Sequence, residues 1–287
     1  MANIPKYSIC ICTKNMGDSL EKCIESIMCQ IDETFEVIVI DDSSTDDTSL
    51  VLAGLKEKHS LLKYESLTYD PMRKLGLARN YSFQIAQGEW CLFHIDADDI
   101  IGAKIKDFTI AVETLAKGFK QDKLYAGKQI HMARRMFLLD KGPFRNIYRG
   151  EDRDLYERLV MDESWVLINH ERFISRMERP ASKLVRKKLY DVTDQTITDI
   201  RKTESITSFL LDIWKARKRV GLKISAYKYL ISVYAFFKAK KLGDLPPTGI
   251  NLETFITYRA AHTKSLSQWC GILDIDYPNR IDSKIFF

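Results

Sequence analysis

The stretch GEWCLFHIDADDI, residues 88–100, joins a short apolar run to three closely spaced carboxylates. Residues 90–95 have the composition of a buried strand, and Asp96, Asp98 and Asp99 follow directly. Burying several carboxylates is costly unless a cation or hydrogen-bond donors meet them. The motif alone therefore leaves two interpretations of equal weight: a polar turn that caps the next helix, or a site for a hard divalent cation.

The sequence on either side of this stretch alternates apolar runs with amphipathic segments. We expect strands at residues 7–12, 35–40, 61–67, 90–95 and 165–169. We expect helices at residues 18–30, 45–58, 75–87, 103–118 and 151–161. Residues 123–139 have the pattern of extended structure. Because the connections are short, this alternation favours an α/β fold with a mainly parallel sheet covered by helices on both faces.

The pattern becomes purely helical from about residue 197, with helices expected at 200–219 and 222–242. We therefore divide the chain into an α/β domain over residues 1–195 and a helical C-terminal region over residues 196–287. The 222–242 helix is rich in aromatic residues and has lysines at both ends. It could pack on the preceding domain as a core helix or lie at a membrane surface.

The composition is that of an ordinary soluble globular protein, since 45% of the 287 residues are hydrophobic and 29% are charged. The six cysteines form no C-x-x-C pair, which argues against a structural zinc site and fits a reduced, cytoplasmic compartment. We see no signal peptide and no apolar run long enough to span a membrane. The net charge is +5, but the basic runs lack interleaved aromatic residues, so we expect no nucleic-acid partner.

Polar residues follow three of the expected strands at the point where each strand ends. Thr13 follows the first strand, Asp42 follows the second, and the acids at 96–99 follow the fourth. The carboxyl ends of parallel strands meet at one edge of a sheet, where α/β proteins bind ligands. Helix capping is an alternative explanation for Asp42, whose carboxylate could instead accept hydrogen bonds from a nucleoside.

Two further charged positions have both a structural and a functional interpretation. Arg79 near the start of a helix could be a solvated charge or could neutralise a diphosphate. Glu151 and Asp152 begin a helix, where acids suit the dipole, yet a carboxylate there could also act as a general base. The histidines form no paired ligand pattern, and we expect His170 to be structural rather than a metal ligand.

Five segments together resemble the family 2 inverting glycosyltransferases, which have the GT-A fold. In chain order they are YSICICTKN at 7–15, VIVIDDSSTDDT at 37–48, GLARN at 76–80, HIDADD at 94–99 and GEDRDLYERL at 150–159. The resemblance covers about residues 5–190 and implies a Rossmann-like, mainly parallel sheet flanked by helices. It implies a nucleotide-sugar-binding half over about 5–100 and an acceptor half over about 100–195.

The resemblance also implies an activity. The chain would be a metal-dependent enzyme that moves a sugar from a UDP- or GDP-linked donor to a hydroxyl of a glycan or lipid-linked acceptor, with inversion. Alternatives are a polyprenyl-phosphate sugar transferase and a nucleotide-sugar-binding subunit without catalysis. A lipid-linked acceptor would suit a cytoplasmic protein that contacts the inner face of the membrane peripherally through residues 200–242.

The resemblance assigns roles to individual residues. The pocket for the nucleobase and ribose would be lined by Cys12, Thr13 and Asp42, with Arg79 facing the diphosphate or the base. Cys12 stands where the family commonly has Pro, and Ser43 stands where it often has Gly.

The resemblance assigns metal binding and catalysis to the acidic segments. Asp96 would contact the ribose or a metal-bound water, and Asp98 would ligate Mn²⁺ or Mg²⁺ with Asp99 beside it. Asp152 would be the catalytic base that takes the proton from the acceptor hydroxyl.

Overall fold

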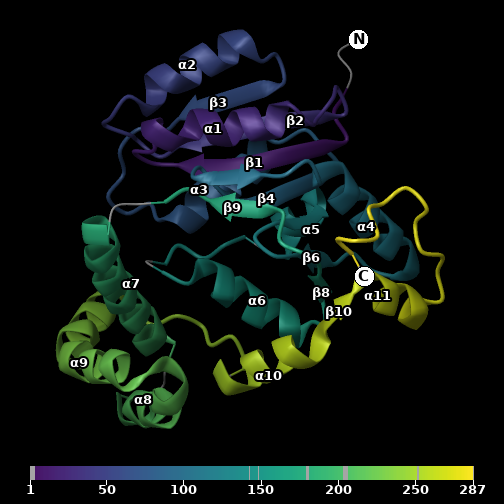
Figure 1. The fold of residues 1–287 in the computed structure, drawn as a ribbon. Coiled ribbons are helices and arrows are strands. Elements are labelled where there is room, and N and C mark those ends of the chain that lie inside the picture. Colours follow the sequence, from purple (N-terminus) through teal and green to yellow (C-terminus); the bar gives the residue numbers. More distant parts are fainter. Residues whose placement is uncertain are drawn as a thin grey trace.

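A mixed sheet forms the centre of the molecule, in a computed structural model that describes residues 4–141, 143–147, 149–178, 181–202, 206–250 and 252–286. Within these residues the sheet has eight strands in the order β10-β8-β6-β7-β4-β1-β2-β3 (Figure 1). Their bounds are β1 (Tyr7–Thr13), β2 (Phe35–Asp41), β3 (Leu62–Ser66), β4 (Trp90–Asp96), β6 (Leu124–Ala126), β7 (His131–Arg134), β8 (Trp165–Asn169) and β10 (Thr263–Ser265). A separate two-stranded sheet joins β5 (Asp99–Ile101) to β9 (Ile174–Arg176).

Most neighbouring strands run parallel. Strand β1 lies between β2 and β4 and is parallel to both, and β3 continues the parallel order beside β2. Strand β7 is the exception, because it runs antiparallel to both β4 and β6. This confirms the expected α/β fold with a mainly parallel sheet, and it brings the carboxyl ends of β1, β2 and β4 to one edge.

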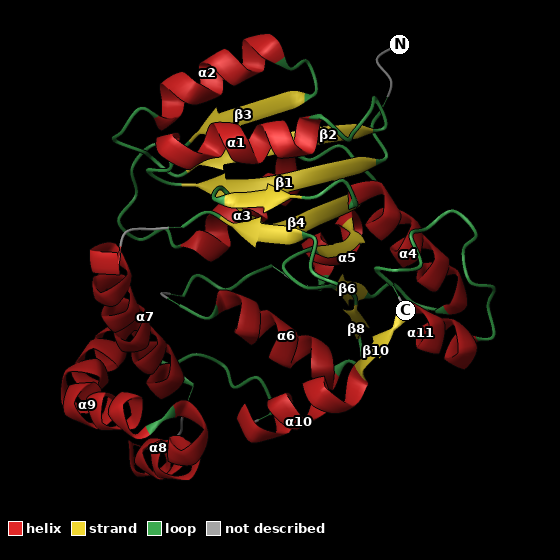
Figure 2. Cartoon of the chain, in the orientation of Figure 1, coloured by secondary structure: helices red, strands yellow, loops and turns green. Residues whose placement is uncertain are grey.

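Helices cover both faces of the sheet (Figure 2). One face packs against α1 (Gly17–Met28), α2 (Thr48–Lys58), α4 (Ile105–Gly118) and α11 (Leu266–Leu273). The other face packs against α3 (Leu75–Ile85), α5 (Arg135–Asp140), α6 (Glu151–Met161) and α10 (Leu252–His262). Side chains alternate between the two faces along a strand, so Ile9 and Ile11 join the first core while Cys10 joins the second. Apolar residues at every position of such a strand are therefore buried, which explains the continuous apolar runs.

The segment expected to be extended over residues 123–139 is extended only as far as Arg134. Residues Arg135–Asp140 form α5 instead, so the sequence expectation was wrong there. The guanidinium of Arg135 donates to the carbonyl oxygens of Phe83 and Gln84, both at 2.9 Å, at the end of α3. Phe137 and the next residue are both buried against the α3 side, which requires adjacent side chains to share a face, as a helix allows.

The C-terminal part contains a helical bundle and then returns to the sheet. The bundle consists of α7 (Ala181–Arg201), α8 (Ile206–Val220) and α9 (Leu222–Leu242), which share a small apolar core of their own (Figure 1). Helix α7 runs through residue 195 without a break, and β10 pairs with β8 in the main sheet. The expectation of purely helical structure after residue 197 was therefore wrong. A three-residue edge strand is too short to produce a periodic pattern in the sequence.

None of the helices in the described part of the chain is both long enough and apolar enough to cross a membrane.

Candidate active site

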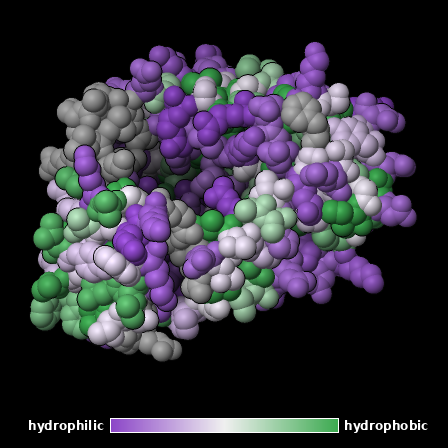
Figure 3. All heavy atoms as spheres, turned by 60° about the horizontal axis from the view of Figure 1, so that its bottom comes forward, coloured by the Kyte–Doolittle hydropathy of each residue, from purple (hydrophilic) through white to green (hydrophobic). Residues whose placement is uncertain are grey.

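The carboxyl ends of β1 and β4 and the start of α6 surround a cavity of about 450 Å³. Polar and charged side chains dominate its walls, and Figure 3 shows a hollow bordered by hydrophilic side chains. Residues from distant segments line it, among them Thr13, Asp96, Asp98, Asp152 and Arg176. The sheet therefore brings together most of the positions that the sequence singled out.

The acidic turn at the end of β4 is held by its own members and by one arginine. Asp99 is buried, and its Oδ2 accepts a hydrogen bond from the backbone N–H of Asp96 at 2.9 Å. The guanidinium of Arg176 donates to Asp99 Oδ1 at 3.0 Å and to Asp96 Oδ2 at 2.5 Å. It also lies 3.7 Å from Asp98 Oδ1. Burial raises the pKa of Asp99, and the hydrogen bond from Arg176 opposes that rise.

The three acids differ in whether their carboxylates face the cavity, where they could bind a cation. Both oxygens of Asp99 are engaged within the turn and by Arg176, whereas Asp96 and Asp98 line the cavity. Across the described ranges, no group of three or more His, Cys, Asp or Glu side chains is arranged to hold a metal ion. A hard cation that arrives with a diphosphate needs only one or two carboxylates, because phosphates and waters complete its shell. The oxygen donors of Asp96 and Asp98 fit such an ion.

Arg79 and Glu151 form a largely buried ion pair at the cavity wall. The Nη1 atom of Arg79 lies 2.9 Å from Glu151 Oε1, and the guanidinium lies 5.3 Å from the ring centroid of Phe144. Burial raises the pKa of Glu151, and the positive charge of Arg79 opposes the rise. Arg79 thus has a protein partner in addition to the place on the wall that the resemblance implied.

Asp152 lies in the first turn of α6 and faces the cavity. Its Oδ1 accepts a hydrogen bond from the backbone N–H of Arg153 at 2.8 Å. Burial acts to raise the pKa of Asp152, but His94 and Arg79 outweigh it and hold that pKa below its ordinary value. The carboxylate is therefore ionised at neutral pH and can accept a proton.

Gly150 makes this start of α6 possible. Its backbone is left-handed, with φ of 78°, and a Cβ there would lie 2.6 Å from the side-chain oxygen of Gln195. Any other residue would be strained in this conformation, and the side chain of Gln195 would have to move to make room for its Cβ. The glycine lets the chain turn sharply so that Glu151 and Asp152 both reach the cavity.

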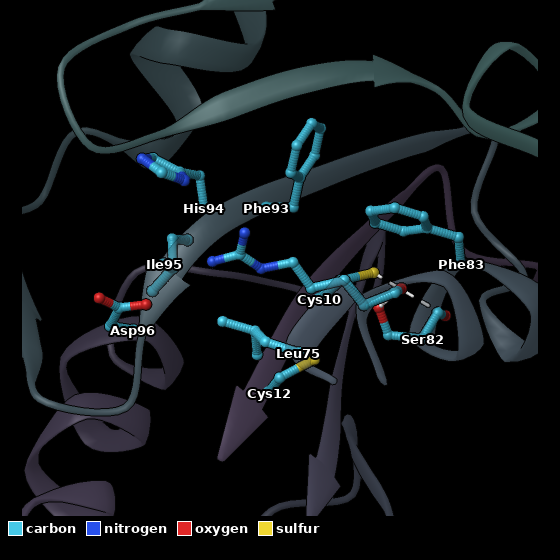
Figure 4. Close-up of a pocket in the computed structure, with 10 residues that line it drawn as sticks. Cys10, Cys12, Leu75, Ser82, Phe83, Phe93, His94, Ile95 and Asp96 are labelled. Atoms are coloured by element: carbon cyan, nitrogen blue, oxygen red, sulfur yellow. Dashed lines mark hydrogen bonds between the residues drawn. The ribbon is translucent and has the colours of Figure 1, made fainter. Parts of the chain in front are cut away.

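The remaining predicted positions follow or end β1 and β2. Cys12 and Thr13 line the cavity, and the buried hydroxyl of Thr13 has no hydrogen-bond partner among the described residues. Asp42 is not among the residues that line the cavity. Its carboxylate pairs with Arg73 at 2.7 Å and lies 3.6 Å from the Nζ atom of Lys14. Figure 4 shows Cys12 and Asp96 among the residues that line a smaller pocket, which shares Arg79 and His94 with the cavity.

Several cavity residues escaped the sequence interpretation. Arg149, Arg153 and Arg176 all line the cavity, as does His94. Arg149 directly precedes the GED segment, so its place in the chain was a usable signal. Arg176 has no such signal, because it reaches the acidic turn only through the pairing of β9 with β5.

His170 has the structural role that the sequence favoured. Its Nε2 accepts a hydrogen bond from the backbone N–H of Lys128 at 2.8 Å, and its Nδ1 lies 2.7 Å from the carbonyl oxygen of Glu171. Burial lowers the pKa of His170 to about 4. Both ring nitrogens are thus engaged by backbone groups.

Comparison with other proteins gives similarity over the N-terminal part of the chain. Residues 8–118 match the model of glycosyl transferase family 2. The GalNAc(5)-diNAcBac-PP-undecaprenol beta-1,3-glucosyltransferase of Campylobacter jejuni is 25% identical over 194 residues, which is 57% of this chain and 62% of that protein. WfaP of Escherichia coli, a UDP-Glc:alpha-D-GlcNAc-diphosphoundecaprenol beta-1,3-glucosyltransferase, is 30% identical over 122 residues, which is 42% of this chain and 47% of that protein. Each match thus spans less than two thirds of the relative's length.

Solved structures extend the likeness to the fold. TarS 1-349 of S. aureus, in complex with UDP-GlcNAc, superimposes with a TM-score of 0.53 at 14% identity, covering 82% of this chain and 90% of TarS. The mannosyltransferase PcManGT of Pyrobaculum calidifontis, in complex with GDP-Man and Mn²⁺, gives a TM-score of 0.57 at 18% identity, covering 95% of this chain and 85% of PcManGT. At such identities the likeness concerns the fold alone.

Proposed function

Through residues 8–118 the chain belongs to glycosyltransferase family 2, and it has the GT-A fold; from this premise we propose that it is a metal-dependent inverting glycosyltransferase. One observation supports the proposal above all others. Thr13, the acids Asp96 and Asp98, and the carboxylate of Asp152 line one cavity although they lie far apart in the sequence. A nucleotide-sugar donor and an acceptor hydroxyl need such a set of groups side by side.

The proposed donor is a UDP- or GDP-linked sugar. TarS was solved with UDP-GlcNAc and PcManGT with GDP-Man, which supports both nucleotides as candidates. Asp96 and Asp98 would hold Mn²⁺ or Mg²⁺, which when bound neutralises the charge that develops on the leaving diphosphate. The guanidinium groups of Arg149 and Arg176, which line the same cavity, can bind phosphate oxygens.

Asp152 is the proposed catalytic base. Its carboxylate takes the proton of the acceptor hydroxyl while that oxygen attacks the anomeric carbon. The new bond forms on the face opposite the departing diphosphate, so the bond between the anomeric carbon and the phosphate oxygen breaks with inversion. The low pKa of Asp152 supports this role, because the group is already ionised at neutral pH.

A hydroxyl of a glycan or a lipid-linked saccharide is the proposed acceptor. The Campylobacter and E. coli relatives are named for undecaprenol-linked acceptors, which supports the lipid-linked form. Such an acceptor would lie at the inner face of a membrane, and we propose peripheral contact there through residues 200–242.

The surface of α8 and α9 supports this contact. Residues 206–242 contain nine lysines and arginines and one acidic residue, Asp212. Apolar side chains on α9 are largely exposed: Leu222 75%, Leu230 80%, Val233 67%, Tyr234 55% and Phe237 69%. Figure 3 shows hydrophobic side chains gathered over this bundle on the same face as the hollow. Basic and apolar groups together suit an anionic lipid surface.

Binding and turnover of nucleotide-sugars test the proposed function. We expect the full chain with Mn²⁺ to bind UDP or GDP in a calorimetric titration and to release it slowly from the matching nucleotide-sugar. Asp152→Asn should lower that release about 100-fold or more without changing nucleotide affinity, because only the proton transfer is lost. Asp162→Asn, at the other end of α6, is the matched control.

Three other results would change the conclusion. Failure to bind any nucleoside diphosphate would reject the donor assignment. Full turnover by Asp152→Asn would reject the base, and tight binding without turnover would favour a non-catalytic subunit.

A further inference from the structure

Strand β4 carries a bulge just before the acidic turn. Ile9 pairs with Leu92 and Ile11 pairs with Ile95, so Phe93 and His94 both lie opposite Cys10. His94 has a left-handed backbone, with φ of 68°, which is uncommon for a residue other than glycine. Bulges turn a side chain away from the direction that regular pleating would give it, and they occur next to active sites.

The bulge directs the imidazole of His94 to the cavity wall (Figure 4). The ring stacks on His131 with centroids 4.4 Å apart and 19° between planes, and its edge faces Tyr156. No hydrogen bond to either ring nitrogen of His94 occurs within the described part of the chain. The ring nitrogens are therefore available to hydrogen-bond a ligand.

Gln129 is a second residue that combines a left-handed backbone with an unused hydrogen-bonding group. It lies in the turn between β6 and β7, has φ of 63°, and lines the same cavity. Its side-chain oxygen is buried and has no hydrogen-bond partner among the described residues. Because Phe93 pairs with His131, this turn comes beside His94 where the two strands end. Two strained positions thus each present an unused hydrogen-bonding group.

We propose that His94 and Gln129 bind hydroxyl groups of the sugar that is transferred and thereby select the donor. This inference rests on the proposed function. The two groups share the cavity with Asp96, on the proposed side of the ribose and metal, and with Asp152, the proposed base. The transferred sugar has to lie between these two places. Imidazole and amide groups suit the hydroxyl groups of a sugar, whereas the surrounding arginines and carboxylates suit phosphate and metal.

Titration calorimetry with the full chain and Mn²⁺ tests this subsite. The probes are UDP, UDP-glucose, UDP-N-acetylglucosamine, GDP and GDP-mannose. His94→Phe keeps an aromatic ring for stacking and removes both hydrogen-bonding groups. We expect it to weaken the preferred nucleotide-sugar about 3- to 10-fold and to leave the parent nucleoside diphosphate unchanged.

Two further variants and one control complete the test. His94→Asn retains donor and acceptor groups and tolerates the left-handed backbone, so it should restore most of the affinity. Gln129→Asn withdraws the amide by one methylene and should produce the same selective loss. His262→Phe is the control, because that ring stacks on Tyr258 in α10 and does not line the cavity.

The outcomes separate the inference from the function on which it rests. Unchanged affinity for every nucleotide-sugar in His94→Phe would overturn it. An equal loss for UDP and UDP-sugars would overturn it as well, because that result indicates a structural role. A raised KM for the acceptor alone would assign the groups to the acceptor instead. If the unmodified chain bound no nucleotide, the proposed function itself would fail.

Discussion

Individual side chains in the cavity divide into those that hold it together and those that face a ligand. Asp99 and Glu151 are buried and engaged by Arg176 and Arg79, so their charges are already balanced inside the protein. Asp152 belongs to the second group, because it is ionised and faces the cavity. The adjacent acids Glu151 and Asp152 therefore have different roles, because Glu151 forms an ion pair with Arg79 whereas Asp152 faces the cavity.

The ion pair between Arg79 and Glu151 should be expensive to break. Glu151→Gln leaves the buried guanidinium without its counter-charge, so we expect the free energy of unfolding to fall by about 3 kcal/mol. Urea denaturation measures this change. Glu163→Gln, an exposed acid beyond the end of α6, should change stability by less than about 0.5 kcal/mol. A loss of similar size in both variants would contradict the prediction.

His170 should make stability depend on pH. Its pKa of about 4 in the folded chain lies below the ordinary value of about 6.5, so unfolding takes up a proton between these two values. The free energy of unfolding should therefore fall as the pH falls from about 6.5 to 4, and by about 2 kcal/mol at pH 5. His170→Asn should remove that part of the difference between pH 7 and pH 5. An identical difference in both proteins would show that His170 does not titrate as inferred.

Secondary-structure elements position these groups and add a surface of their own. The short pair β5–β9 carries Arg176 to the acidic turn, and the turn between β6 and β7 carries Gln129 to the cavity. The fully buried residues of helix α9 are small, among them Ala235 and Ala239, while several of its large apolar side chains, such as Leu230 and Phe237, are exposed. Such a helix can pack closely on its neighbours and still present an apolar surface to a membrane.

The exposed face of α9 should bind anionic lipid. We expect the full chain to float with vesicles that contain phosphatidylglycerol and to float much less with neutral vesicles. Leu230→Glu combined with Phe237→Glu should abolish flotation without lowering the melting temperature, because both side chains are exposed. Leu50→Glu, equally exposed on α2, should float like the unmodified chain.

Point substitutions test membrane contact more cleanly than deletion of the C-terminal region. Deleting residues 200–287 would also remove β10 and α11, which belong to the main sheet and its core. The proposal of membrane contact fails if the unmodified chain does not float with either kind of vesicle.

Elements from across the molecule contribute to one polar cavity: the sheet edge, helices that cover the sheet, and the bundle through Gln195 of α7. The proposed donor site takes side chains from β1, β4, α6 and β9, which lie together only in the folded chain. Ligand binding should therefore be visible as a gain in global stability.

Melting temperature reports this coupling. At a concentration of about 100 times its Kd, UDP or GDP with Mn²⁺ should stabilise the chain by about 3 kcal/mol, a rise of roughly 5 °C or more. Asp98→Asn should remove the part of the rise that requires Mn²⁺, since its oxygens are proposed ligands. A full Mn²⁺-dependent shift in Asp98→Asn would reject that assignment, and Asp122→Asn at an exposed position is the control.

The amino-acid sequence alone predicted the alternation of strands and helices, the mainly parallel sheet and the polar residues at the ends of β1, β2 and β4. Each of these depends on short-range periodicity and on the rule that parallel strands end at one edge. Only packing in three dimensions sets the partners: Arg176 for the acidic turn, Glu151 for Arg79, β10 for β8, and the cavity position of His94. Ion pairs, edge strands and bulges arise when segments distant in the chain pack together, and packing of that kind leaves no periodic pattern in either segment.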